Sequence, residues 1–167
     1  MTGHKKSNDY LHQERHDRLL REWDHDPYHS KLKIQDPSVC TDCGAVFHKG
    51  RWQWGGAPAD ARQAVCPACH RIKERVPAGI LTIQGEFFSE HEEEIMHLVH
   101  NTEAAKKNEH PLQRIMAIED TDEGRVITFT DPHLARAVGE ALHHAYKGEL
   151  DFHYTEEDVL LRLSWRR

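Results

Sequence analysis

The chain contains four cysteines, arranged as two pairs with two residues between the members of each: Cys40 and Cys43, then Cys66 and Cys69. Two thiolates at this spacing can both reach one tetrahedral ion at about 2.3 Å. Gly44 loosens the turn after the first pair, and Pro67 stiffens the second. Four soft thiolates leave no open coordination position. The pattern therefore predicts one structural Zn(II) ion rather than a catalytic metal.

Two other uses of four cysteines compete with zinc. A disulfide framework is typical of small secreted domains, but the N-terminal sequence has no signal-peptide core. An iron site of the rubredoxin type uses the same tetrahedral sulfur geometry. Zinc is the preferred interpretation, and iron stays open as the alternative.

Basic and aromatic side chains lie between the two pairs and directly after the second pair. They are Lys49, Arg51, Trp52, Trp54, Arg71, Lys73 and Arg75. This composition is typical of surfaces that stack nucleobases and contact phosphates. The competing interpretation is that the tryptophans cover a small zinc-centred core. We expect one of the two tryptophans, Trp52 or Trp54, to face outward, away from such a core.

Charge is distributed unevenly along the 167 residues, whose formal net charge is −6. Residues 31–85 carry eight basic and four acidic side chains, whereas residues 86–123 carry three basic and eleven acidic ones. A net negative chain does not bind nucleic acid by bulk charge, so affinity for RNA must come from a local patch. No apolar run is long enough to span a membrane, and we expect a cytoplasmic, bacterial protein without a membrane partner.

Other chemistry is poorly represented in the sequence. Glu94, His97 and His100 lie at helical spacing, but a di-metal carboxylate site needs a second such set on another helix. Surface histidines are the preferred interpretation of this group. The chain has no phosphate-binding glycine loop and no nucleophile-elbow serine, and its only cysteines are those assigned to the metal. We therefore predict that the protein is not an enzyme.

The elements that must position these residues indicate an α+β chain in four parts. Residues 1–37 form an N-terminal helix and connector, and residues 38–85 form the four-cysteine zinc ribbon, including a short strand at 80–83. Residues 86–110 form an acidic helix, for which Ser89 and Glu92 match a capping box. Residues 111–167 form a small antiparallel module in the order ββαββ.

Within residues 111–167, two signals locate the second helix and the last strand. Asp131 followed by Pro132 is typical of a helix start, and apolar residues then recur at helical spacing as far as Gly148. In the last strand, Leu161, Leu163 and Trp165 alternate with polar residues, which indicates one buried face.

The order of a zinc ribbon, a hairpin over residues 118–129 and the motif Asp131-x-x-Leu134-Ala135-Arg136 resembles the ribosomal large-subunit export adaptor of eukaryotes and archaea. With Lys49-Gly50-Arg51-Trp52, the pattern is also similar to a family of short bacterial zinc-ribbon proteins. The resemblance covers residues 38–165. The export adaptor carries more cysteine pairs than the two present here. The likeness implies binding to the large ribosomal subunit or its RNA, without catalysis.

These observations together predict a non-catalytic zinc protein that associates with the ribosome or with RNA. The basic, tryptophan-containing ribbon face would contact ribosomal RNA, and the acidic helix would meet ribosomal proteins, which are usually basic. The alternative is a zinc-ribbon adaptor that binds another protein and no nucleic acid. A salt-sensitive affinity for RNA would distinguish the first function from the second.

Overall fold

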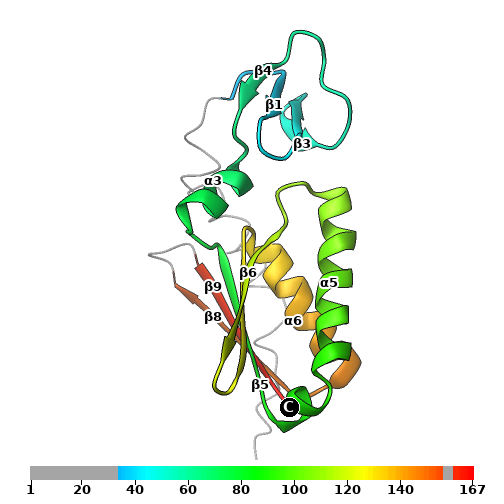
Figure 1. Cartoon of the computed structure of the whole chain (residues 1–167), viewed down its shortest axis with the longest axis vertical. Coiled ribbons are helices and arrows are strands. Elements are labelled where there is room, and N and C mark those ends of the chain that lie inside the picture. The colour runs from blue at the N-terminus through cyan, green and yellow to red at the C-terminus, as the bar shows by residue number, and fades with distance from the viewer. Residues whose placement is uncertain (1–33, 156–159) are drawn as a thin grey trace, which may run out of the picture.

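The ribbon lies at one end of the molecule, above the larger sheet (Figure 1). The structure is a computed structural model that describes residues 34–155 and 160–167. The predicted N-terminal helix and most of its connector lie outside the described residues, as does Val159. Element labels follow Figure 1, in which the first helix described is α3.

Four short strands form the ribbon sheet, in the order β3-β2-β1-β4. They are β1 (Ser38–Cys40), β2 (Val46–His48), β3 (Arg51–Gln53) and β4 (Arg62–Ala64). Lys49 and Gly50 connect β2 to β3 with φ angles of 52° and 76°, the backbone that a tight two-residue hairpin requires. The Asp36 carboxylate accepts a hydrogen bond of 3.1 Å from the Gly50 amide. Helix α3 (Pro67–Glu74) follows β4. From here on, the ribbon means residues 38–78.

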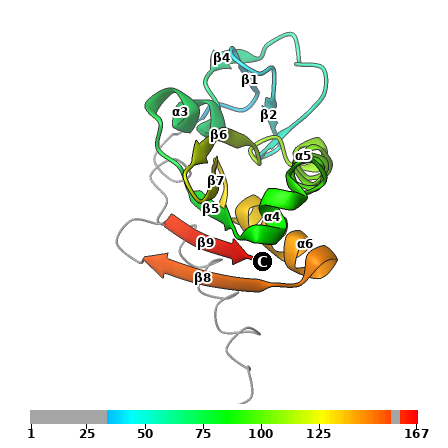
Figure 2. The same cartoon turned by 60° about the horizontal axis from the view of Figure 1, so that its bottom comes forward.

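The second sheet has five strands, in the order β6-β7-β5-β9-β8. Its elements are β5 (Gly79–Gln84), α4 (Glu86–Glu90), α5 (Glu92–Glu109), β6 (Ile115–Thr121), β7 (Gly124–Phe129), α6 (Pro132–Tyr146), β8 (Glu149–Thr155) and β9 (Leu160–Arg166). We call residues 79–167 the α/β module. Helices α5 and α6 lie on the same face of this sheet (Figure 2).

Strand β5 differs most from the sequence prediction. The sequence pattern places this strand in the zinc ribbon and predicts a four-stranded ββαββ module without it. In the structure, β5 lies at the centre, antiparallel to β7 and parallel to β9. Burial alternates along β5, which explains why the strand lies at the centre of the sheet: Leu81 and Ile83 are fully buried under the helices. The expected β6, β7, α6, β8 and β9 are all present, but β7 and β9 are separated by β5.

Helix α6 begins as the sequence predicted. The Asp131 carboxylate accepts hydrogen bonds from the His133 and Leu134 amides, at 2.7 and 3.4 Å, and Pro132 occupies the first turn. The apolar stripe of α6 packs on the sheet face formed by Leu161, Leu163 and Trp165. The expected mixture of helices and strands is therefore confirmed, and the α/β module has its own core between the two long helices and the five strands.

The predicted capping box at the start of α5 is wrong. Ser89 lies inside the short helix α4, where its hydroxyl donates to the Gly85 carbonyl at 3.3 Å. The N-cap of α5 is His91, whose side chain makes no capping hydrogen bond. A serine inside a helix has the carbonyl four residues back within reach, so it does not serve the next helix start.

Candidate metal centre

The four cysteine sulfurs come together at the junction of the ribbon strands and α3. All four Sγ atoms lie within 4.8 Å of one another, and those of Cys43 and Cys66 are 3.7 Å apart. A tetrahedral ion with metal–sulfur bonds of about 2.3 Å requires sulfur–sulfur separations of about 3.8 Å. The sulfur arrangement therefore fits one metal ion. It is the only such cluster among the described residues.

Local backbone structure holds the sulfurs in place. Cys66 is the N-cap of α3, and its Sγ accepts a hydrogen bond from the Cys69 amide at 3.4 Å. The Cys40 Sγ accepts from the Cys66 amide at 3.3 Å, which joins the two cysteine pairs. Gly44 has a φ of 78°, as expected for the residue that completes the first turn. Amide donors aimed at sulfur favour the thiolate form that a metal requires.

The thiols differ in how easily they ionise. Burial opposes ionisation of Cys40, but hydrogen bonds from the backbone of Cys66, Cys43 and Asp42 outweigh it and lower the pKa to about 7. Burial raises the pKa of the Cys66 thiol, and it also raises that of Cys69. A metal ion supplies the positive charge that keeps such buried sulfurs deprotonated. The lowered pKa of Cys40 and the raised pKa values of Cys66 and Cys69 are therefore compatible with a cluster that binds a metal ion.

The disulfide alternative does not fit this geometry. All four cysteines are free thiols. The sulfur–sulfur distance of 3.7 Å between Cys43 and Cys66 is far beyond the roughly 2.05 Å of a disulfide bond. The cysteines are therefore available together as four ligands.

Arg114 is the site residue that the sequence analysis missed. Its Nη2 donates to the Cys43 and Cys66 sulfurs at 3.1 and 3.3 Å, and its Nη1 donates to the Cys69 sulfur at 3.3 Å. The side chain is only 7% exposed. Burial disfavours the charged guanidinium, but the sulfurs around it raise the pKa of Arg114. No spacing pattern relates this arginine to the cysteines, because it precedes β6 in the other module.

The predicted nucleic-acid residues divide between surface and interior. Lys49 and Arg51 are exposed on the β2–β3 hairpin, and Arg75 is exposed at the end of α3. Lys73 is exposed as well, and its ammonium contacts the Asp42 carboxylate at 2.7 Å. Arg71, however, is 5% exposed, and its guanidinium donates to the Val76 carbonyl at 3.1 Å. Arg71 therefore stabilises the end of α3 and does not belong to a surface for RNA.

The two tryptophans of the ribbon have different environments. Trp52 is half-buried against the cysteine cluster, and its ring lies 5.5 Å from that of Phe47, centroid to centroid. Trp54 is 36% exposed, and its indole Nε1 donates to the Lys107 carbonyl at 2.7 Å. Lys107 lies in the last turn of α5, where carbonyls lack helical partners. Trp54 is thus a contact between the ribbon and the α/β module.

A cleft of about 320 Å³ separates the β2–β3 hairpin from the loop that follows α5. The lining residues are Ile34, Phe47, Gly50, Arg51, Trp52, Pro67, His110, Pro111, Leu112 and Gln113. The set includes an aromatic pair and an arginine but no carboxylate. This volume lies at the small end of the range for ligand-binding clefts.

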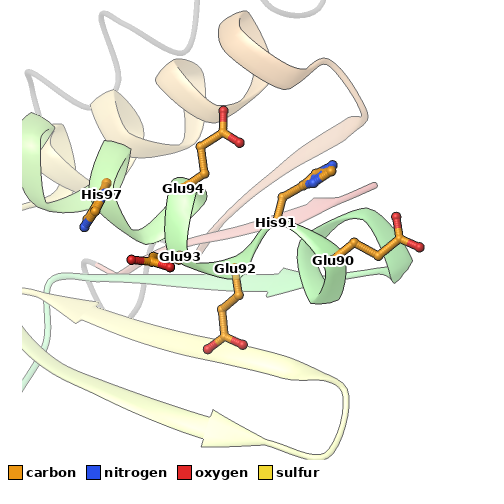
Figure 3. Close-up of a pocket in the computed structure, with 6 residues that line it drawn as sticks. All are labelled: Glu90, His91, Glu92, Glu93, Glu94 and His97. Atoms are coloured by element: carbon orange, nitrogen blue, oxygen red, sulfur yellow. The ribbon is translucent and has the colours of Figure 1, made fainter.

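The acidic side chains at the start of α5 do not converge on one point. Figure 3 shows the side chains of Glu90, Glu92 and Glu94 pointing in different directions, away from a common point. Glu92 forms an ion pair with Arg125 on β7, and Glu94 accepts a hydrogen bond of 3.1 Å from the Tyr146 hydroxyl. His97 and His100 are exposed. The described structure therefore agrees with surface histidines at this helix.

Comparisons with protein-family models, with curated proteins and with solved structures gave no match for this chain. Within the described residues, every helix is too short or too polar to cross a membrane. The function is therefore argued from the cysteine cluster, the cleft beside it and the distribution of charge.

Proposed function

We propose that this protein is a non-catalytic zinc protein that associates with the ribosome or with RNA through the exposed part of its ribbon. The observation that carries the proposal is the cleft beside the metal centre, where the Phe47–Trp52 pair and Arg51 meet. The metal centre supports the hairpin that bears these residues. The proposed RNA face consists of Lys49, Arg51, Trp52 and Phe47.

Zinc is the proposed ion because the donor set is closed. Four cysteine sulfurs complete a tetrahedron, and no further protein or solvent ligand is needed. Tetrahedral sulfur also suits iron, so the test is elemental analysis of protein purified without added metal. One zinc per chain supports the assignment. One iron per chain, with the visible absorption of an iron–thiolate site, contradicts it.

Stacking and phosphate contact are the interactions that the cleft supports. An aromatic face contributes about 1–3 kcal/mol for each stacked base in single-stranded nucleic acid. Trp52 is half-buried, which leaves part of its ring at the cleft, and Arg51 is exposed on the same strand. The lining residues include no carboxylate, which limits the repulsion that a phosphate would meet, although the Asp36 carboxylate lies close by, on the Gly50 amide.

The distribution of charge supports an oriented approach to such a partner. Five glutamates lie in α4 and the first turn of α5: Glu86, Glu90, Glu92, Glu93 and Glu94. This acidic region and the β6–β7 turn lie at the end of the α/β module away from the ribbon (Figure 1). These five glutamates are therefore distant from the proposed RNA face. We include in the proposal that this acidic end faces basic ribosomal protein.

The first experiment compares RNA binding by two arginine variants of the ribbon. Arg51→Ala removes the cation at the cleft, and Arg62→Ala removes an exposed cation from β4, outside the cleft. We expect Arg51→Ala to weaken binding to a single-stranded RNA and to reduce its salt dependence by about one counterion, while Arg62→Ala binds like the wild type. Equal binding by both variants contradicts the proposed face.

The second experiment is a sucrose gradient of lysate from the native host, at low and at high salt. Comigration with the large ribosomal subunit at low salt, lost at high salt, supports the ribosomal role. A protein that stays at the top of the gradient and binds no RNA contradicts that role. The result would favour the protein–protein adaptor instead.

A further inference from the structure

All three nitrogens of the Arg114 guanidinium donate hydrogen bonds. Two nitrogens donate to the three sulfurs of Cys43, Cys66 and Cys69, and Nε donates to the Pro111 carbonyl at 2.7 Å. Cys40 is the one ligand that Arg114 does not contact in these hydrogen bonds. The guanidinium therefore lies over the face of the sulfur tetrahedron opposite Cys40.

The backbone of Arg114 belongs to the α/β module. Its amide donates to the Thr130 hydroxyl at 2.9 Å, and its carbonyl accepts from the Thr130 amide at 2.9 Å. The Thr130 hydroxyl donates to the Leu112 carbonyl at 2.6 Å. Thr130 itself lies between β7 and the start of α6. One residue thus joins the sulfur cluster of the ribbon to the sheet of the other module.

The charges explain why this contact is strong. A divalent ion held by four thiolates keeps two net negative charges in a buried place, and one arginine offsets half of them. Hydrogen bonds between a guanidinium and anionic sulfur are charge-assisted. A buried guanidinium that loses its acceptors is strongly unfavourable. The contact is therefore favourable only while the sulfurs are held together.

We infer that Arg114 is a positioning residue that makes the metal centre a joint between the ribbon and the α/β module. The ion holds the sulfurs in the arrangement that matches the guanidinium fork, so metal binding fixes the ribbon against β6 and β7. Loss of the ion removes that arrangement and loosens the joint. The loop of residues 110–113, which forms one wall of the cleft, precedes Arg114 directly. Metal occupancy therefore controls the shape of the cleft, whatever the cleft binds.

The test measures amide hydrogen exchange and zinc release on the full chain, with and without a chelator. In the wild type, we expect the chelator to speed exchange in the ribbon and also in residues 110–116. In Arg114→Gln, we expect residues 110–116 to exchange fast already in the zinc-loaded protein, with little further effect of the chelator. Zinc release should be about tenfold faster or more, the usual loss when an outer-shell partner of a metal site is removed.

Two further variants separate positioning from a general loss of stability. Arg114→Lys keeps the charge but has no planar fork, so we expect zinc release between the wild-type and Arg114→Gln rates. Arg136→Gln is the matched control, because Arg136 pairs with Glu140 on α6 and contacts no cysteine in the described structure. It should behave like the wild type. Wild-type zinc release and wild-type exchange at residues 110–116 in Arg114→Gln would overturn the inference.

Thr130→Val keeps the inference testable if the Arg114 variants do not fold. This change removes the hydroxyl that anchors the Arg114 backbone but leaves the guanidinium and all four cysteines in place. We expect faster exchange at residues 110–116 in the zinc-loaded protein and a smaller increase in zinc release. Exchange and zinc release equal to the wild type would contradict a joint that passes through Arg114.

Discussion

The ribbon and the α/β module are stabilised in different ways. In the part of the chain that the structure describes, the core of the α/β module consists of fifteen buried residues, which include Trp165, Phe129 and Leu81. The core of the ribbon consists of five buried residues, and three of these are cysteines of the metal centre. So small a core offsets little of the chain entropy lost on folding, so we expect the ribbon to need the proposed metal. With the proposed metal bound, one chain would combine a unit held by a metal with a unit held by hydrophobic packing.

Substitutions in the two units should therefore destabilise different parts of the molecule. Removal of a ligand should unfold the ribbon and leave the larger sheet folded, whereas a cavity in the larger core should do the reverse. Contacts between the two units should transmit only part of either effect.

Cys66→Ser should have the largest effect. Cys66 is fully buried and is both a proposed metal ligand and the N-cap of α3. We expect loss of the bound metal and of amide protection throughout the ribbon, because structural zinc contributes on the order of 10 kcal/mol to such small units. The β5–β9 sheet should keep its slow exchange. Native mass spectrometry and hydrogen exchange measure both results.

Thr41→Ala is the control for the ligand variant. Thr41 lies between the cysteines of the first pair, is exposed, and supplies no sulfur. It should retain the metal and the ribbon protection. A Cys66→Ser protein with intact ribbon protection would show that packing, rather than the metal, holds the ribbon.

Leu81→Ala should destabilise the α/β module by about 2–5 kcal/mol, because the change leaves a cavity in a fully buried site. The ribbon should still bind its metal. Thermal melting and metal content measure the two parts. Ile80→Ala, on the other face of the same strand and only half-buried, should cost less. Loss of metal from Leu81→Ala under conditions where the wild type keeps it would show that the two units fold as one.

Trp54→Phe should have the smallest effect. The change keeps an aromatic ring but removes the indole donor to the Lys107 carbonyl, and such a hydrogen bond contributes about 0.5–1.5 kcal/mol. We expect faster exchange in the last turn of α5 and unchanged metal binding. Unaltered exchange in that turn would show that this contact does not couple the ribbon to α5.

The sequence was informative where the determining interactions are local. The cluster of four cysteines follows from the Cys-x2-Cys spacing, and the start of α6 follows from Asp131 and Pro132. The buried face of β9 follows from strict alternation. In each of these cases, residues within one turn or one strand carry the signal.

The sequence was uninformative where partners lie far apart along the chain. Strand β5 pairs with β7 and β9, and no local pattern says that it belongs to their sheet rather than to the ribbon. Arg114 meets Cys43 across 71 positions. The sequence predicts Arg71 as a surface cation, yet its side chain is buried and donates to the Val76 carbonyl. Composition describes a segment, but it does not say which of its side chains turn inward.

The position of β5 has a consequence for the order in which the protein can be built during synthesis. The ribbon precedes the larger sheet, and its cysteines are all present once Cys69 has been added. The central strand β5 pairs along its length with β9, the last strand among the described residues. One edge of β5 therefore stays unpaired, and the apolar face around it stays uncovered, until β9 has been synthesised. The metal centre can be complete while the larger core is still open, with Arg114 emerging in the interval between the two.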